Sequence, residues 1–333
     1  MDEEQLPPRD HWYIACASAQ LGRAPRAAQV MGHALALYRG ADGTPRALLD
    51  RCSHRGVRLS LGRVEGDTLA CGYHGWRFAG DGACVAVPSL ARGRRVAAGC
   101  GVPALPCVEG CGYVWVWTGG PGVPIGPAPE ITGFTARRWS QGSVEAACGW
   151  LAALENNLDW CHPVFAHRWT HGLFYMALLR GLTDTTLALT AVADGLRVDG
   201  PLGADGGPTR GALTLVFSLP CRAEIVGPGP RRIVVHCVPT VAGRCRMEWM
   251  MSRTLPLGPR VRFVAGEPVI FRQDRLLLES AVAAQEDADW RERSVEADAP
   301  TLLLRRIVAL AARGEWDATR AAAEGRRLVR VRA

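Results

Sequence analysis

Short apolar runs separated by turns fill the first third of the chain. Four of these runs have the length and composition of β-strands, at residues 30–38, 47–50, 68–71 and 113–117. Asp-Gly pairs at 42–43 and 81–82 stand between such runs and are typical of hairpin turns. We therefore predict an all-β N-terminal domain at residues 1–120.

A stretch rich in proline and glycine follows this domain. Residues 119–129 contain four residues of each type, a composition typical of a linker. We place the linker at 121–134 and a second domain at 135–333. The length of 333 residues agrees with two domains, because it exceeds what one hydrophobic core usually supports.

The second domain mixes helical and strand patterns. Helices are predicted at 147–159, at about 268–290 and at 301–313, and long alternating segments at 185–198, 212–225 and 232–254 predict antiparallel strands. Strands flanked by helices at both ends indicate an α+β domain. The chain as a whole is therefore predicted to be α+β.

Composition narrows the class of protein. Apolar residues make up 48% and charged residues 21%, as in globular proteins. No run of eighteen apolar residues occurs and the N-terminus is acidic, so we expect a soluble, cytoplasmic protein without membrane association. The net charge of +7 comes from arginine alone and is scattered, which argues against a nucleic-acid partner. We interpret the basic tail at 326–332 as a solvated end.

Two short motifs combine cysteine with histidine. Cys52-Ser53-His54 is followed, after sixteen residues, by Cys71-Gly-Tyr-His74. One thiolate and one imidazole from each arm form the ligand set of a Rieske [2Fe–2S] centre. A Cys2His2 zinc site uses the same atoms, but zinc fingers pair Cys with Cys and His with His, whereas here each arm mixes them.

The other ten of the twelve cysteines are expected to be reduced thiols, because we expect no secretion. Cys100, Cys107 and Cys111 crowd together in a Gly/Pro-rich stretch. A second metal site is one interpretation of this group. We favour small, buried side chains.

A second group of metal-binding residues follows the linker. Asn156, Asp159 and His162 are spaced three apart and share one helix face, so Asp159 is placed to hold the ring of His162. His162 and His167 with a carboxylate form the ligand set of non-haem Fe(II) oxygenases. On an unbroken helix these histidines would lie about 140° apart. We predict that Pro163 breaks the helix between them and so lets them converge.

The carboxylate ligand must come from elsewhere in the chain. Asp274 lies on the apolar stripe of a predicted helix, together with Phe271 and Leu278. A buried carboxylate needs a cation. Arg275 and Glu279 face elsewhere as an exposed i,i+4 pair. Asp274 is therefore our choice of ligand, with Glu279 as the alternative.

These motifs resemble those of a known family. Cys52-Ser-His-Arg-Gly and Cys71-Gly-Tyr-His-Gly-Trp-Arg-Phe resemble the two cluster loops of the Rieske non-haem iron oxygenases. The pattern Asn-x-x-Asp-x-x-His-x4-His at 156–167 is similar to the family's iron motif, and 271–285 resembles its C-terminal ligand helix. Length and order resemble the homotrimeric vanillate O-demethylase and dicamba monooxygenase group.

The resemblance implies a fold and a set of site residues. An all-β Rieske [2Fe–2S] domain would precede a helix-grip (START-like) α+β catalytic domain. The implied cluster ligands are Cys52, His54, Cys71 and His74, and the implied ligands of a mononuclear Fe(II) are His162, His167 and Asp274. Asp159, supported by Asn156, would link His162 to His74 of the neighbouring subunit in a homotrimer.

The resemblance also implies a function. We expect the catalytic (alpha) subunit of a terminal oxygenase that uses O2. Its electrons would come from NAD(P)H through a separate ferredoxin or flavin/[2Fe–2S] reductase, since this chain has no dinucleotide-binding glycine motif. The expected reaction is monooxygenation, by hydroxylation or oxidative O- or N-demethylation, of an aromatic or polycyclic small molecule. Ring cis-dihydroxylation is the enzymatic alternative. A Rieske electron carrier with a non-catalytic C-terminal domain is the alternative of another class.

Substrate contacts are harder to assign from sequence. Five residues on predicted strands are candidates for a pocket: Phe217, His236, Met247, Trp249 and Met250. Only half of any strand faces one side of its sheet. We therefore expect core packing to be the more common role among them.

Overall fold

The structure is a computed structural model of the whole chain. It describes residues 7–131, 133–135, 139–167, 183–201, 211–227, 232–252, 263–264, 267–285, 287 and 289–332. The chain forms two compact units, the N-terminal unit Arg9–Ala136 and the C-terminal unit Arg137–Ala333 with Met1–Pro8.

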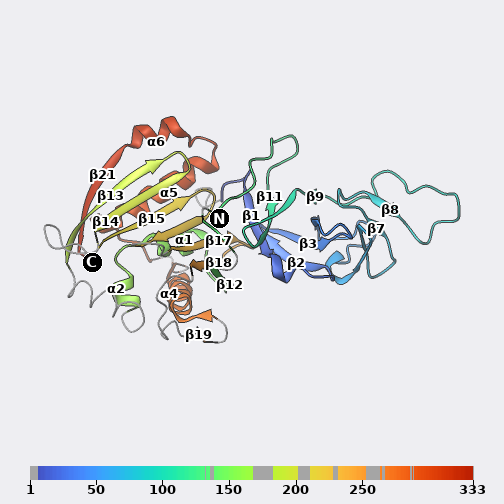
Figure 1. Ribbon diagram of the computed structural model, residues 1–333, viewed down its shortest axis with the longest axis horizontal. Helices are drawn as coiled ribbons and strands as arrows, with labels where there is room; N and C mark the ends of the chain where they lie inside the picture. Colours follow the sequence, from blue (N-terminus) through green and yellow to red (C-terminus); the bar gives the residue numbers. More distant parts are fainter. Residues whose placement is uncertain are drawn as a thin grey trace. The chain divides into compact units, whose positions relative to one another are not determined.

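The N-terminal unit consists of short antiparallel strands in three small sheets (Figure 1). The first sheet has the order β1-β11-β10, with strands Trp12–Ala17, Tyr113–Trp117 and Cys107–Gly110. The second has the order β2-β3-β4-β9, with strands Arg26–Val30, His33–Arg39, Pro45–Leu49 and Ala104–Leu105. The third has the order β5-β6-β7-β8, with strands Arg63–Glu65, Thr68–Ala70, Arg77–Phe78 and Cys84–Ala86. The predicted all-β character is confirmed.

Turn residues explain where these strands end. The run predicted at 30–38 is divided, because Met31 and Gly32 form a turn with positive φ (52° and 78°) between β2 and β3. Cys52 lies shortly after β4 of the second sheet, and Cys71 directly follows β6 of the third sheet. A core that includes Tyr38, Leu59, Leu69 and Phe78, each with 0% exposure, packs against it. This core makes a rigid base for the loops around it.

The C-terminal unit is built on one antiparallel sheet (Figure 1). Among the described residues it has eight strands in the order β12-β18-β17-β16-β15-β14-β13-β21. The strands are β12 Trp139–Ala146, β13 Asp184–Val192, β14 Gly195–Pro201, β15 Ala212–Ser218, β16 Arg222–Val226, β17 Arg232–Pro239, β18 Cys245–Ser252 and β21 Arg326–Arg332. A two-stranded ribbon, β19 Phe263–Val264 and β20 Glu267–Pro268, precedes the long C-terminal helix. The antiparallel strands predicted at 185–198, 212–225 and 232–254 are confirmed, and each segment is a hairpin.

Helices accompany this sheet. They are α1 Trp150–Leu158, α2 Pro163–Ala166, α4 Val269–Gln285, α5 Ala299–Ala312 and α6 Ala318–Glu324. α1 packs on β15 to β18 and α5 on β14. Nδ2 of Asn157, on α1, lies 4.0 Å from Sγ of Cys237, on β17. Phe271 of α4 stacks on Trp249 of β18, with ring centroids 5.7 Å apart. The predicted α+β class is confirmed. Among the described helices, none is long and apolar enough to cross a membrane.

The basic tail corrects one expectation. Residues 326–332 are not a solvated end but strand β21, which pairs with β13 from Asp184↔Arg332 to Thr190↔Arg326. Val329 and Val331 are buried, whereas Arg330 and Arg332 are exposed. The alternation of valine and arginine is the period-two pattern of a half-buried strand, which the charge of the segment obscured.

Candidate metal centres

Cys52 and Cys71 sit at equivalent points of two loops in the N-terminal unit. Cys52 follows β4 and Cys71 follows β6, and both side chains are buried, with 3% and 2% exposure. His54 and His74 are exposed. The two thiols therefore lie at the base of the loops and the two imidazoles lie nearer to solvent.

The backbones of the two loops match. In each, the cysteine N–H donates to the carbonyl five residues ahead, and the cysteine carbonyl accepts from a glycine N–H four residues ahead. The pairs are Cys52–Val57 (2.8 Å) and Cys52–Gly56 (2.9 Å) in the first loop, and Cys71–Trp76 (2.8 Å) and Cys71–Gly75 (3.0 Å) in the second. The two glycines have φ of 71° and 70°, a left-handed conformation that favours glycine. The loops are thus two copies of one turn.

Aromatic contacts join the loops. The rings of His54 and His74 lie 4.7 Å apart, centroid to centroid. Trp76 of the second loop stacks on His54 of the first at 4.6 Å with an interplanar angle of 3°. The ring centroids of Tyr73 and His74 lie 3.8 Å apart. The sequence motifs did not indicate that Trp76 holds the opposite loop, because the contact appears only when the loops face each other.

The electrostatics of these groups agree with a soft metal cluster. Burial raises the pKa of Cys52, and the neighbouring Cys71 thiol adds to the effect. Desolvation lowers the pKa of His54, and the charge of His74 acts in the same direction. A buried thiol that resists ionisation gains most from a cation, and a neutral imidazole has a nitrogen lone pair to offer. The residues fit a cluster held by two Cys and two His.

Three further cysteines of this unit were considered for a second metal site. Cys107 begins β10, Cys111 follows its end, and the carbonyl of Cys100 accepts a 2.5 Å hydrogen bond from the hydroxyl of Ser53. All three are half-buried.

The second centre lies where α1 ends. Asp159 leaves the helical conformation (φ −75°, ψ 116°), and His162 and His167 flank the four-residue helix α2. The predicted break between the two histidines is therefore misplaced. The break precedes His162, which has helical φ and ψ (−60°, −34°), and Pro163 is the first residue of α2, where its missing N–H costs no hydrogen bond.

Three ligand atoms converge at this point, all within 4.8 Å of one another. Oδ1 of Asp274, on α4, lies 3.1 Å from Nε2 of His167 and 3.6 Å from Nε2 of His162. The two imidazole rings are 5.3 Å apart and nearly perpendicular, at 77°. Figure 1 shows α2 and α4 on the same side of the sheet. The structure thus brings together the two histidines and the carboxylate that the sequence singled out.

Each histidine is held at its other nitrogen. Nδ1 of His162 lies 3.1 Å from the backbone carbonyl of Asp159, and Nδ1 of His167 lies 3.0 Å from Oε1 of Gln273. An N–H at each Nδ1 leaves a lone pair at each Nε2, which is directed at the carboxylate. Gln273 was missed from the sequence. Its position next to Asp274 was the available signal.

Asp159 differs in detail from the expectation. Its Oδ1 accepts hydrogen bonds from the backbone N–H groups of Cys161 (2.7 Å) and His162 (3.2 Å), while Oδ2 lies 4.0 Å from Nδ1 of His162. The carbonyl of Asp159, rather than its carboxylate, holds the ring. Asn156, one turn earlier on α1, is half-buried, and its carbonyl accepts from the N–H of Asp159.

The charges of this centre call for a cation. Burial lowers the pKa of His162, and Asp274 and Asp159 offset this only in part. Burial also opposes protonation of His167, but its hydrogen bonds and the charge of Asp274 outweigh it and raise its pKa. Asp274 is buried, and Nε2 of each histidine lies close to its Oδ1. Two lone pairs and a carboxylate oxygen that face one another fit a divalent metal with two nitrogen ligands and one oxygen ligand.

Glu279, the alternative ligand, lies outside this group. Its Oε2 is 3.2 Å from Nη1 of Arg275, and its Oε1 accepts from the N–H of Ala147 at 2.9 Å. The second contact ties α4 to the segment before α1. Glu279 thus has a structural role in the region that holds Asp274.

The residues considered for a pocket are all buried: Phe217, His236, Met247, Trp249 and Met250. Alternation from Trp249, which contacts α4, puts Met247 on the helix-covered face and Met250 on the other. Trp249 also lies against Gly142 of β12, where a Cβ would come within 2.4 Å of the indole. Trp249 is therefore the candidate that packs on the helix carrying Asp274.

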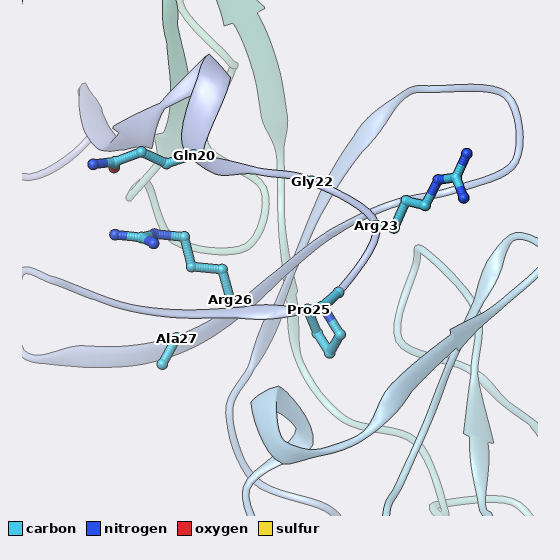
Figure 2. A pocket seen from close by; sticks show the side chains of 7 residues that line it. Gln20, Gly22, Arg23, Pro25, Arg26 and Ala27 are labelled. Carbon is cyan, nitrogen blue, oxygen red and sulfur yellow. The ribbon is translucent and has the colours of Figure 1, made fainter.

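A shallow hollow in the N-terminal unit is a weaker candidate site. It is lined by Gln20, Gly22, Arg23, Ala24, Pro25, Arg26 and Ala27. Figure 2 shows the side chain of Arg23 pointing away from those of Gln20 and Arg26. These groups do not converge on one point, as the polar groups of a small-molecule site do.

Comparison with known proteins assigns the N-terminal part of the chain to a domain family. Residues 11–108 match the family model of the Rieske [2Fe-2S] domain. The chain is 38% identical over 164 residues to chlorophyllide a oxygenase of Chlamydomonas reinhardtii. This alignment covers 48% of this chain and 24% of that protein. It is 34% identical over 165 residues to the oxygenase component of dicamba O-demethylase of Stenotrophomonas maltophilia, which covers 48% of each.

The fold agrees over a longer span. The crystal structure of dicamba monooxygenase bound to dicamba superposes with a TM-score of 0.75 at 22% identity, over 92% of this chain and 98% of that one. The chain spans about half or less of the length of the curated relatives it matches. In three of them the aligned part is 24%, 38% and 52% of the relative's length. The chain thus contains a Rieske [2Fe-2S] domain at residues 11–108 and shares the fold of dicamba monooxygenase over most of its length.

Proposed function

We propose that this chain is the terminal oxygenase component of a multicomponent Rieske system, and that it monooxygenates an aromatic or polycyclic small molecule. Its Rieske domain, at about 1–120, would hold a [2Fe–2S] cluster, and its catalytic domain, at about 135–333, a mononuclear Fe(II). The proposed cluster ligands are Cys52, His54, Cys71 and His74, and the proposed iron ligands are His162, His167 and Asp274.

One observation carries the proposal. The atoms Nε2 of His162, Nε2 of His167 and Oδ1 of Asp274 converge within 4.8 Å, in a chain that also contains a Rieske domain. When bound, the cluster supplies single electrons and the Fe(II) activates O2. A Rieske electron carrier has no use for the second centre. Its presence favours the oxygenase over an electron carrier with a passive C-terminal domain.

The surrounding residues prepare the centre for this chemistry. The carbonyl of Asp159 holds the ring of His162, and Phe271, three residues before Asp274 on α4, stacks on Trp249 of the sheet. Oδ1 of Asp159 is taken up by the turn before α2. Oδ2 belongs to a side chain that is 43% exposed, and can accept from a donor outside the chain. In a homotrimer we propose His74 of a second copy as that donor.

The names of relatives support the substrate class. They include oxygenases for chlorophyllide a, 3-chlorobenzoate and dicamba, all of which contain aromatic or macrocyclic rings. The partner would be a ferredoxin or a flavin/[2Fe–2S] reductase that draws on NAD(P)H. Such a partner fits the cytoplasmic location expected from the sequence.

Metal analysis followed by product analysis tests the proposal. After anaerobic loading with Fe(II), we expect about three iron atoms and about two acid-labile sulfides per chain. With a surrogate reductase and a panel of methoxylated, methylated and polycyclic compounds, we expect one hydroxylated or demethylated product per O2 consumed. About two iron atoms and two sulfides after loading would contradict the oxygenase and support the electron carrier. A cis-diol product would reassign the reaction as dihydroxylation.

A further inference from the structure

We infer that Gln273 is a positioning residue that aims Nε2 of His167 at the metal. This inference rests on the proposed function, since it concerns the same centre. It assigns a role to a side chain that neither the ligand motif nor the spacing of the histidines indicated. One turn of α4 contacts both nitrogens of this imidazole.

Adjacent residues of α4 contact opposite sides of the His167 ring. Oε1 of Gln273 lies 3.0 Å from Nδ1, and Oδ1 of Asp274 lies 3.1 Å from Nε2. Consecutive residues of a helix point about 100° apart, so two neighbours can grip a ring that lies between them. Because both contacts come from one rigid helix, the position of α4 determines the direction of the ring.

His167 needs such support more than His162 does. It follows α2, which has only four residues, and its φ and ψ (−108°, 21°) are no longer helical. The backbone alone therefore fixes the ring poorly. His162 is held by the backbone carbonyl of Asp159, a contact that does not depend on which side chain residue 159 carries. Gln273 supplies through its side chain what the backbone supplies on the other side of the centre.

The amide oxygen also selects the protonation pattern of the ring. An oxygen acceptor at Nδ1 keeps the proton there, which leaves the lone pair at Nε2. A metal-ligating histidine commonly donates its second N–H to an oxygen in this way, and loss of the acceptor typically weakens metal binding by about 10- to 100-fold. Gln273 is half-buried, so water does not fully replace it.

Three variants of the full chain test the inference. Gln273→Leu removes the acceptor at similar size, Gln273→Glu retains an oxygen acceptor, and Gln285→Leu makes the same change at an exposed position of the same helix. The visible absorption of the cluster and the circular dichroism of each variant establish that it folds. Affinity for Fe(II) is measured by chelator competition at one pH, and the geometry of the iron by the EPR spectrum of its nitric oxide complex.

We expect Gln273→Leu to bind Fe(II) about 10- to 100-fold more weakly with an altered EPR spectrum, Gln273→Glu to recover most of the affinity, and Gln285→Leu to match the wild type. Equal affinity and an unchanged spectrum in Gln273→Leu would overturn the role of Gln273 and leave the proposed function intact. A wild-type chain that binds no third iron would overturn both.

Discussion

Oδ1 of Asp274 lies 3.1 Å from Nε2 of His167, although α4 and α2 are separated in sequence by six strands of the large sheet. The carboxylate is buried, and Nε2 of His162 also lies 3.6 Å from this oxygen. Because a buried carboxylate is costly unless a cation compensates it, we interpret the three converging groups as a metal site.

Removal of Asp274 should empty the mononuclear centre and leave the cluster in place. We expect Asp274→Ala to contain about two iron atoms and two sulfides per chain, against about three iron atoms in the wild type, and to form no oxygenated product. Iron and sulfide assays on the same samples measure this. Glu279→Ala, which loses the contacts with Arg275 and Ala147, is the control and should keep the third iron. The reverse result would make Glu279 the ligand.

Asp159→Asn should separate metal binding from electron transfer. The asparagine amide keeps an oxygen that can accept from the N–H groups of Cys161 and His162, so the turn and both metal centres should remain. The lost negative charge should slow electron transfer by roughly tenfold or more. Single-turnover oxidation of the pre-reduced cluster, followed by stopped-flow absorbance, measures the rate. A rate equal to that of the wild type is incompatible with the bridging role.

His236 should make the C-terminal unit sensitive to acid. Burial, with a smaller contribution from Arg222, lowers the pKa of His236 from 6.5 to about 3. The unfolded chain therefore takes up this proton below pH 6.5 while the folded chain does not, so stability is full above pH 6.5 and declines as the pH falls towards 3. At pH 5 the decline amounts to about 2 kcal/mol.

Urea denaturation between pH 7.5 and 5 measures this decline. His236→Gln should flatten the dependence of the unfolding free energy on pH, whatever its stability at pH 7.5. His33→Gln, a change at an exposed position of β3, should leave the slope as it is in the wild type. Equal slopes in the wild type and in His236→Gln would show that other groups cause the sensitivity to acid.

The C-terminal strand should contribute to stability through its valines. Val331, with 4% exposure, packs on the inner face of β21, whereas Leu328, with 63% exposure, faces outward. We expect Val331→Ala to lower the free energy of unfolding by about 2 kcal/mol and Leu328→Ala to change it by less than about 0.5 kcal/mol. Equilibrium urea denaturation compares them. Equal, small effects would return the tail to the solvated end that its charge suggested.

Local pattern was sufficient for much of this molecule. The two Cys-x-His and Cys-x-x-His arms, their glycines and the strand at 113–117 could be predicted because each depends on residues close together in sequence. The helices at 147–159 and 301–313 appear within a few residues of their predicted ends, as Trp150–Leu158 and Ala299–Ala312. The helix predicted at 268–290 ends earlier, at Gln285. Strand β12 and helix α6 were not predicted.

The sequence by itself determined which atoms are available: two thiols, the imidazoles and an acid on an apolar helical stripe. Only the tertiary structure decided which of them meet. Hairpin closure and helix packing bring Asp274 and Gln273 to His167, stack Trp76 on His54, and turn an arginine-rich tail into a strand beside β13. Such contacts depend on burial and chain closure over long separations, which local periodicity does not record.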